Sequence, residues 1–177
     1  MLIDIAKQQL RKAGWYEGRK IDLTKYEEAY AEVGCELFPA ARKFLEEYGD
    51  LDIQDKYIST ATYENGDHFI VINRSLIDVA YCCCPRDLKL EEMVDELFHQ
   101  KILRVGAIDH GNIDIYISED GRFFVNWYFD GLWAENSDQL WNEYYGEDYG
   151  RATWDDLKAG KGRTIYKKNT YNSVQEL

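Results

Sequence analysis

Three histidines are the side chains in this 177-residue chain best suited to bind a metal or move a proton. His68, His99 and His110 lie far apart in the sequence, and none belongs to a His-Glu-x-x-His motif or a comparable ligand spacing. A structural or solvent-facing role is the simpler interpretation of each, and a ligand or base is the alternative. The histidine pattern predicts no metal site.

Three of the four cysteines, Cys82, Cys83 and Cys84, are adjacent. Neighbours in an extended run point to opposite faces, so the cluster is not a disulfide framework, and no Cys-x-x-Cys pair exists. The pattern favours free thiols in a reducing compartment. A nucleophile would need a histidine partner, and a thiol buried in apolar surroundings is unreactive because its pKa is raised. We predict no catalytic residue and no cofactor.

Carboxylates are the most abundant ionisable side chains in the sequence. The most distinctive stretch that contains them is an aromatic and acidic segment, residues 123–150. This segment contains no lysine or arginine. Tyrosine and tryptophan dominate binding hot spots, and carboxylates around them would select a basic partner. The alternative is that the aromatic rings fill the core. We predict partner contacts from Asp130, Trp133, Glu135, Asp138, Trp141, Glu143, Tyr144, Glu147, Asp148 and Tyr149. Of these we expect Trp141, Tyr144 and Tyr149 to be partly exposed.

The net charge of −12 is concentrated in the middle of the chain. Residues 21–150 hold ten basic and twenty-eight acidic side chains, a local charge of −18, whereas both ends are basic. Such a field repels nucleic acid and anionic membranes and attracts basic proteins. Solubility alone is an equally good explanation of the charge. With so many acids, carboxylate pairs occur at any spacing and indicate no particular reaction.

A β-hairpin is predicted over residues 112–128. Ile113, Ile115 and Ile117 alternate with other residues in the period of a strand with one buried face. Asp120-Gly121 is a turn dipeptide before a second β-prone run, and glycine readily adopts the positive φ of such a turn. A second hairpin is predicted around Asn65-Gly66, between β-prone runs over residues 57–63 and 68–72, and a shorter β-prone piece covers residues 51–53.

Apolar residues at helical spacing predict three helices before Gly49, over residues 2–13, 24–33 and 38–48. Thr24 and Glu27 have the form of a capping box at the start of the second. Residues 90–102 predict another helix, residues 75–84 are ambiguous between strand and helix, and residues 103–108 look extended.

The C-terminal part predicts two more helices and a last strand. Asn136-Ser137 could cap a helix, Thr153 and Asp156 resemble a capping box, and residues 163–167 are β-prone. We expect one α+β domain over residues 1–177, with a central, largely antiparallel sheet and helices packed against it. No apolar run approaches a membrane span and no secretory signal is evident, so we expect a cytoplasmic protein.

Four short sequence motifs, in the order in which they occur along the chain, resemble the third immunity-protein group of the SUKH superfamily. They are Leu10-x-x-Ala-Gly-Trp15 with Gly18-Arg19, Phe38-Pro-Ala-Ala41 with Phe44-Leu45-x-x-Tyr-Gly49 and Leu51, Arg104-Val-Gly106, and Ile117-Ser-Glu-Asp-Gly-Arg-Phe123. The resemblance covers residues 1–130. The sequence departs from the pattern at Asp50, where a second glycine is usual, and in residues 133–149.

The resemblance implies an α+β fold without enzymatic activity that binds and neutralises a cognate secreted toxin inside the producing cell. It transfers no interface residue, because contact surfaces in the family vary with the toxin. The sequence leaves two alternatives open: a regulatory protein-interaction module of the same fold, and a small hydrolase. The expected partner is a basic toxin protein rather than nucleic acid or membrane, and the oligomeric state is undetermined.

Overall fold

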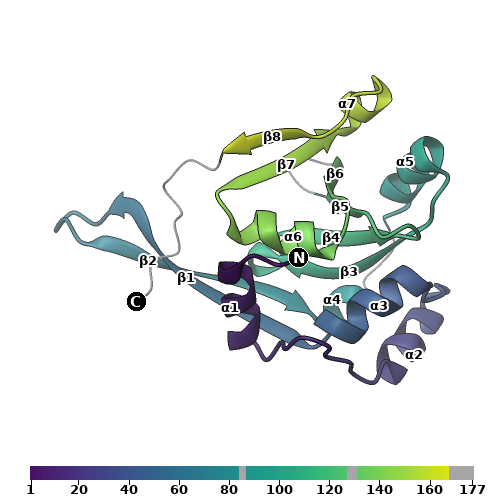
Figure 1. Cartoon of the computed structure of the whole chain (residues 1–177), viewed down its shortest axis with the longest axis horizontal. Helices are drawn as coiled ribbons and strands as arrows, with labels where there is room; N and C mark the ends of the chain where they lie inside the picture. Colours follow the sequence, from purple (N-terminus) through teal and green to yellow (C-terminus); the bar gives the residue numbers. More distant parts are fainter. Residues whose placement is uncertain (84–86, 127–130, 168–177) are drawn as a thin grey trace.

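The computed structural model describes residues 1–83, 87–126 and 131–167, apart from the side chains of residues 56–61 and 69–71. Eight strands form one antiparallel sheet in which each strand pairs with its neighbour in the sequence (Figure 1). The strands are β1 (Leu51–Thr62), β2 (His68–Ile77), β3 (Ile102–Ile108), β4 (Ile113–Ser118), β5 (Phe123–Asn126), β6 (Gly131–Ala134), β7 (Asp148–Thr153) and β8 (Thr164–Lys167). The predicted α+β class is confirmed.

Four helices cover one face of the sheet: α1 (Asp4–Lys12), α2 (Thr24–Glu32), α3 (Pro39–Tyr48) and α6 (Ser137–Tyr145). Their apolar stripes share one core with alternate residues of the strands, such as Ile115, Ile117 and Phe123. The three stripes before Gly49 therefore bury against one sheet face, as predicted. The N-terminal segment also joins α6, because Ile3 N donates a 2.8 Å hydrogen bond to Asn142 Oδ1.

The opposite face is covered by α5 (Leu88–Phe98) and α7 (Trp154–Lys158). Tyr116 and Phe124 point to this side, and the Phe124 and Trp154 rings stack at 5.8 Å. The expectation of one buried face for the strand at residues 113–118 is therefore incomplete. Tyr116 is buried because a second helical layer lies over it.

Both predicted hairpins are present. β1 pairs with β2 around Asn65-Gly66, where Gly66 has φ +87°, and this hairpin projects from the body of the molecule (Figure 1). β4 pairs with β5 around Gly121, whose φ is +90°. Ser118 holds that turn through hydrogen bonds with Asp120 and Arg122. The end of the predicted 112–128 hairpin lies outside the described residues.

The ambiguous segment at residues 75–84 contains both elements, since β2 runs to Ile77 and a short helix, α4 (Val79–Cys82), follows. β3 leads through a 3₁₀ turn, Asp109–Gly111, into β4. Strands β6 and β7 were not predicted. Each is short, and β7 begins with the exposed Asp148, so neither has a strong strand pattern.

Two of the three predicted helix caps form. The Asn136 side chain accepts from Gln139 N, and Thr153 and Asp156 make a complete capping box. The predicted box at Thr24 is wrong. Asp22 instead accepts from the Thr24 amide and hydroxyl, while Glu27 pairs with Arg42 at 2.5 Å.

Residues of the motifs that resemble the family have structural roles in this fold. Trp15 Nε1 donates to the Glu47 carboxylate and Arg19 to the Glu47 carbonyl, which fixes the loop after α1 on the end of α3. A Cβ on Gly49 would lie 2.5 Å from the Leu45 carbonyl. Asp50 has φ +61°, which explains why glycine suits this position, and its carboxylate accepts from the Tyr26 hydroxyl at 2.8 Å.

No helix among the described residues is long and apolar enough to cross a membrane. Among the described residues no disulfide involves Cys35, Cys82 or Cys83, and Cys84 lies outside them.

Candidate protein interface

Helix α6 positions four of the ten predicted contact residues in the aromatic and acidic segment, Asp138, Trp141, Glu143 and Tyr144. Its N-terminus is ordered by two hydrogen bonds, from Gln139 N to Asn136 Oδ1 and from Glu135 N to Gln139 Oε1, both 2.9 Å. Asp138 lies in the first turn, where the helix dipole favours a carboxylate, and it pairs with the terminal amine of Met1 at 2.7 Å. Asp130 lies outside the described residues.

Trp141 is completely buried, so the expectation that it is partly exposed is wrong. Its ring lies 5.6 Å from that of Tyr48 and stacks on Tyr145 at 6.3 Å. Leu140, Trp141 and Tyr145 are buried on the inward side of α6, where Trp141 and Tyr145, four positions apart, lie on the same face of the helix. This aromatic ring is a core residue and cannot anchor a partner in this conformation.

Glu143 is also withdrawn from the surface. Its carboxylate accepts from Gly150 N at 2.6 Å and from Arg163 Nη2 at 2.5 Å, and both charged side chains are about nine-tenths buried. The pair ties β7 and the segment before β8 to α6. The segment itself has no cation, and Arg163 from further along the chain neutralises this acid.

The remaining aromatic residues are half-buried and take part in internal contacts. The Tyr144 hydroxyl accepts from Asn73 Nδ2 at 2.9 Å and from Ser75 Oγ at 3.1 Å, which connects α6 to β2. The Trp133 ring lies 6.4 Å from that of Tyr144, and Tyr149 stacks on Tyr166 at 5.4 Å. Each residue keeps part of its surface accessible.

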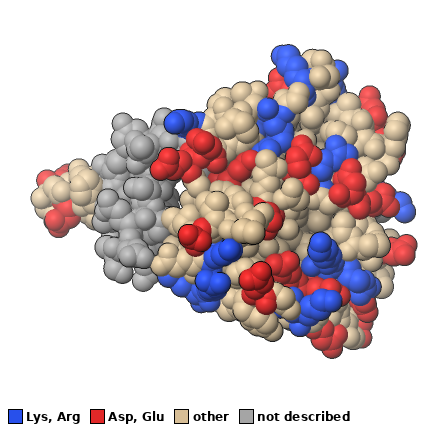
Figure 2. Space-filling model, in the orientation of Figure 1, with Lys and Arg blue, Asp and Glu red and all other residues tan. Residues whose placement is uncertain are grey.

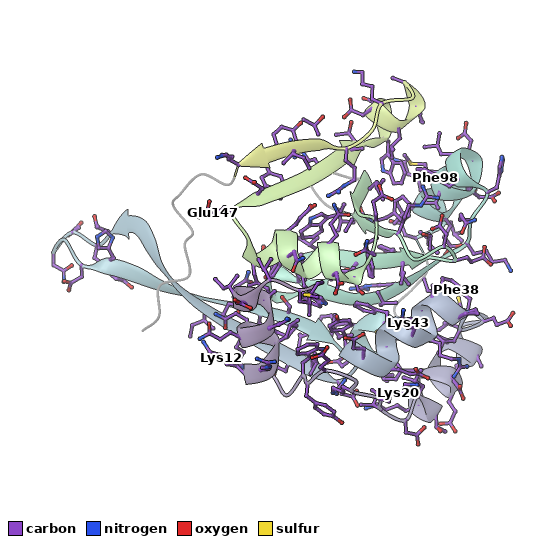
Figure 3. All side chains as sticks on the ribbon, in the orientation of Figure 1. Lys12, Lys20, Phe38, Lys43, Phe98 and Glu147 are labelled. Atoms are coloured by element: carbon purple, nitrogen blue, oxygen red, sulfur yellow. The ribbon has the colours of Figure 1, made fainter. Side chains whose placement is uncertain are left out.

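The exposed acids of the segment fall at the two ends of α6. Glu135 precedes the helix, whereas Glu147 and Asp148 follow it, in the turn where Figure 3 labels Glu147. A helix of nine residues separates these ends by roughly 14 Å. The segment therefore presents two small acidic sites, and Figure 2 shows acidic and basic side chains interspersed over the face that it draws.

A buried carboxyl lies beneath the helix. Asp55 of β1 accepts from the Tyr145 hydroxyl at 3.1 Å, and its other oxygen has no hydrogen-bond partner among the described residues. Burial raises the pKa of Asp55 to about 6, against the opposing effects of the Tyr145 hydrogen bond and of Lys12. No sequence pattern marked this residue, because its burial depends on the packing of α6 over β1.

The groups considered for catalysis do not converge. His68 and His110 are exposed, and His99 ends α5 in a left-handed conformation. Burial raises the pKa of the Cys82 thiol well above its ordinary value, which leaves it protonated. Within the described ranges no group of three or more histidine, cysteine, aspartate or glutamate side chains could hold a metal ion.

Comparison with known proteins gives one match. A family model described as SUKH-3 immunity protein matches residues 4–145, which include α1 through α6 and strands β1 to β6. No curated protein and no solved structure matches the chain.

Proposed function

The chain belongs to the SUKH-3 immunity protein family, and from this premise we propose that it binds and neutralises a cognate toxin whose contact surface is basic. The observation that carries the proposal is the local charge of −18 over residues 21–150. A protein with this field attracts cations and repels polyanions. A toxin domain that acts on nucleic acid has the complementary charge, because it must itself be basic to bind its substrate.

Fast association suits this role, since the immunity protein must reach the toxin before the toxin reaches its target in the cell. Opposed fields raise association rates from about 10⁵–10⁶ to about 10⁸–10⁹ M⁻¹s⁻¹ at low salt. Glu135, Glu147 and Asp148 are exposed and can contribute to steering. Trp133, Tyr144 and Tyr149 keep accessible surface that can be desolvated in a complex.

The proposal gives different roles to the other four predicted contact residues, Asp130, Asp138, Trp141 and Glu143. Asp138 retains 44% of its side-chain exposure, but its charge is largely compensated by the Met1 amine, whereas Trp141 and Glu143 stabilise the fold from the interior. Asp130 stays a predicted contact, since it lies outside the described residues.

The test measures association with the candidate toxin domain at several salt concentrations. The candidate is a basic C-terminal domain of a long secreted protein, to be sought in the reading frames adjacent to the one that encodes this chain. A Glu147→Lys/Asp148→Lys variant should associate several-fold more slowly at low salt, with little change in dissociation. A Glu17→Lys/Glu64→Lys variant is the matched control, because it makes the same charge change at exposed sites outside the segment. An association rate indifferent to salt contradicts the steering role.

A further inference from the structure

A large cleft opens at the end of the sheet where β3 begins. One wall is formed by the loop before α3 and by α3 itself, where Figure 3 labels Phe38 and Lys43, and the other wall is formed by α5. Residues 100–103 and Glu119, from the turn between β4 and β5, close it. Its volume is about 1080 Å³, at the upper limit of the roughly 300–1,000 Å³ typical of small-molecule sites. This size favours a segment of a macromolecule.

The inner surface of the cleft is apolar. Leu37, Phe38, Ile102 and Leu103 line it, and each retains between 6% and 9% of its surface. These side chains belong to the cores on both sides of the sheet, because Ile102 faces α5 and Leu103 faces α3. The floor is therefore rigid and can receive apolar side chains without a change in the fold.

The rim is acidic. Six carboxylates line the cleft against three cations, a local charge of −3; the acids are Glu36, Glu46, Glu91, Glu92, Asp95 and Glu119, and the cations are Arg42, Lys43 and Lys101. Arg42 is already paired with Glu27, which does not line the cleft, so its charge is largely compensated. Charges along a concave apolar wall focus the field inside it. The cleft therefore favours a cationic occupant.

Gln100 adds an independent indication of a ligand. Gln100 lines the cleft and is partly exposed, while its Oε1 is inaccessible to solvent and has no hydrogen-bond partner among the described residues. A buried acceptor without a donor is rare, because it loses the hydrogen bond that water would supply. If the partly exposed Gln100 side chain turns toward the cleft, a donor from an occupant, such as a guanidinium or a backbone amide, would satisfy this oxygen.

We propose that this cleft receives an extended basic segment of the partner toxin, with apolar side chains on Phe38 and Ile102 and cationic groups beside Glu92 and Asp95. The inference rests on the proposed function, because the segment belongs to the toxin. Glu92 and Asp95 are exposed and lie three residues apart on α5, so both carboxylates reach the same side of the cleft. On binding, the Gln100 side chain turns toward the segment and its carbonyl accepts a hydrogen bond from it.

The test uses two synthetic peptides and the full-length, isotopically labelled protein. The first, acetyl-Arg-Leu-Lys-Leu-Arg-amide, combines both chemistries; the second, acetyl-Glu-Leu-Gln-Leu-Glu-amide, keeps the leucines and reverses the charge. Amide chemical shifts should change at residues 34–39, 91–95 and 100–103, together with the side-chain amide of Gln100, for the basic peptide only. A Glu92→Lys/Asp95→Lys variant should bind it about tenfold or more weakly. The Glu17→Lys/Glu64→Lys variant, which makes the same charge change at exposed sites away from the cleft, should bind within twofold of the unmodified chain.

Three results would overturn the inference. The first is that the chemical shift changes caused by the basic peptide are absent or spread over the whole acidic surface. The others are that the Glu92→Lys/Asp95→Lys variant binds the peptide as tightly as the unmodified chain, or that the chain self-associates through the cleft without peptide. Thermal unfolding of each variant establishes that the fold is retained. Inhibition of the candidate toxin domain is measured separately. If the chain inhibits the toxin domain but the basic peptide does not bind in the cleft, the cleft proposal is rejected and the proposed function is retained. If the basic peptide binds in the cleft but the chain does not inhibit the toxin domain, the proposed toxin partner is rejected and the cleft remains a binding site for a basic segment.

Discussion

The Tyr145 hydroxyl donates a hydrogen bond to the buried carboxyl of Asp55, and this pair joins the end of α6 to β1. The pKa of Asp55 is about 6, raised from 3.8 mainly by burial. Between these two values the folded chain holds more protons than the unfolded chain. The free energy of unfolding therefore falls as pH rises through this window, by up to about 3 kcal/mol.

An Asp55→Asn variant should remove this dependence, because asparagine keeps an acceptor for Tyr145 without a charge to desolvate. We expect it to be more stable than the unmodified chain at pH 7.5 and similar at pH 4. Urea unfolding at both values measures the difference, and Asp148→Asn at an exposed site is the control. Parallel stability curves for the Asp55→Asn variant and the unmodified chain would contradict the assignment.

Trp141→Ala should act on stability rather than on binding. Removing a fully buried tryptophan costs about 3–5 kcal/mol through lost contacts and the cavity left behind. Denaturant unfolding should show this loss, while the folded fraction dissociates from the toxin domain at the unmodified rate. If the Trp141→Ala variant were as stable as the unmodified chain but dissociated faster from the toxin domain, Trp141 would have to contact the toxin.

The Glu143 and Arg163 pair should behave as one buried unit. Glu143→Gln leaves the Arg163 guanidinium without its counter-charge and should cost about 3 kcal/mol or more. The double variant Glu143→Gln/Arg163→Met should recover part of that loss. A double-mutant cycle of unfolding free energies measures the coupling, and additive losses would show that the two side chains act independently.

Replacing cysteines 82–84 singly by alanine should leave toxin neutralisation intact. Cys82→Ala should cost on the order of 1 kcal/mol, because its thiol is buried. Stability and protection against the toxin domain are measured for each variant. Loss of protection at unchanged stability would indicate a chemical role for a thiol.

Local patterns predicted most elements of the fold, because their signals lie within one segment. The Asn65-Gly66 and Gly121 turns and the Thr153 capping box each depend on residues close in sequence. The second helical layer could not be predicted from the strand at residues 113–118, because the period of a strand does not distinguish an aqueous face from one covered by a helix.

The interface was harder to predict, since an aromatic ring has the same sequence signal in a core as in a binding surface. Trp141 is buried and Tyr144 is not, although both lie on α6. No sequence pattern predicted the cleft. Glu36, Glu92 and Glu119 come from three separate segments, and only the fold places them around one concave surface.

The contact of Ile3 with Asn142 imposes an order on folding during synthesis. The apolar face of α1, with Ala6 and Leu10, lies against a core that α6 completes. At about 5–20 residues per second, the ribosome needs roughly 7–28 s to make the intervening chain. The first helix therefore leaves the ribosome long before α6, and the part of its apolar surface that α6 covers remains open to chaperones or to misfolding until α6 is made.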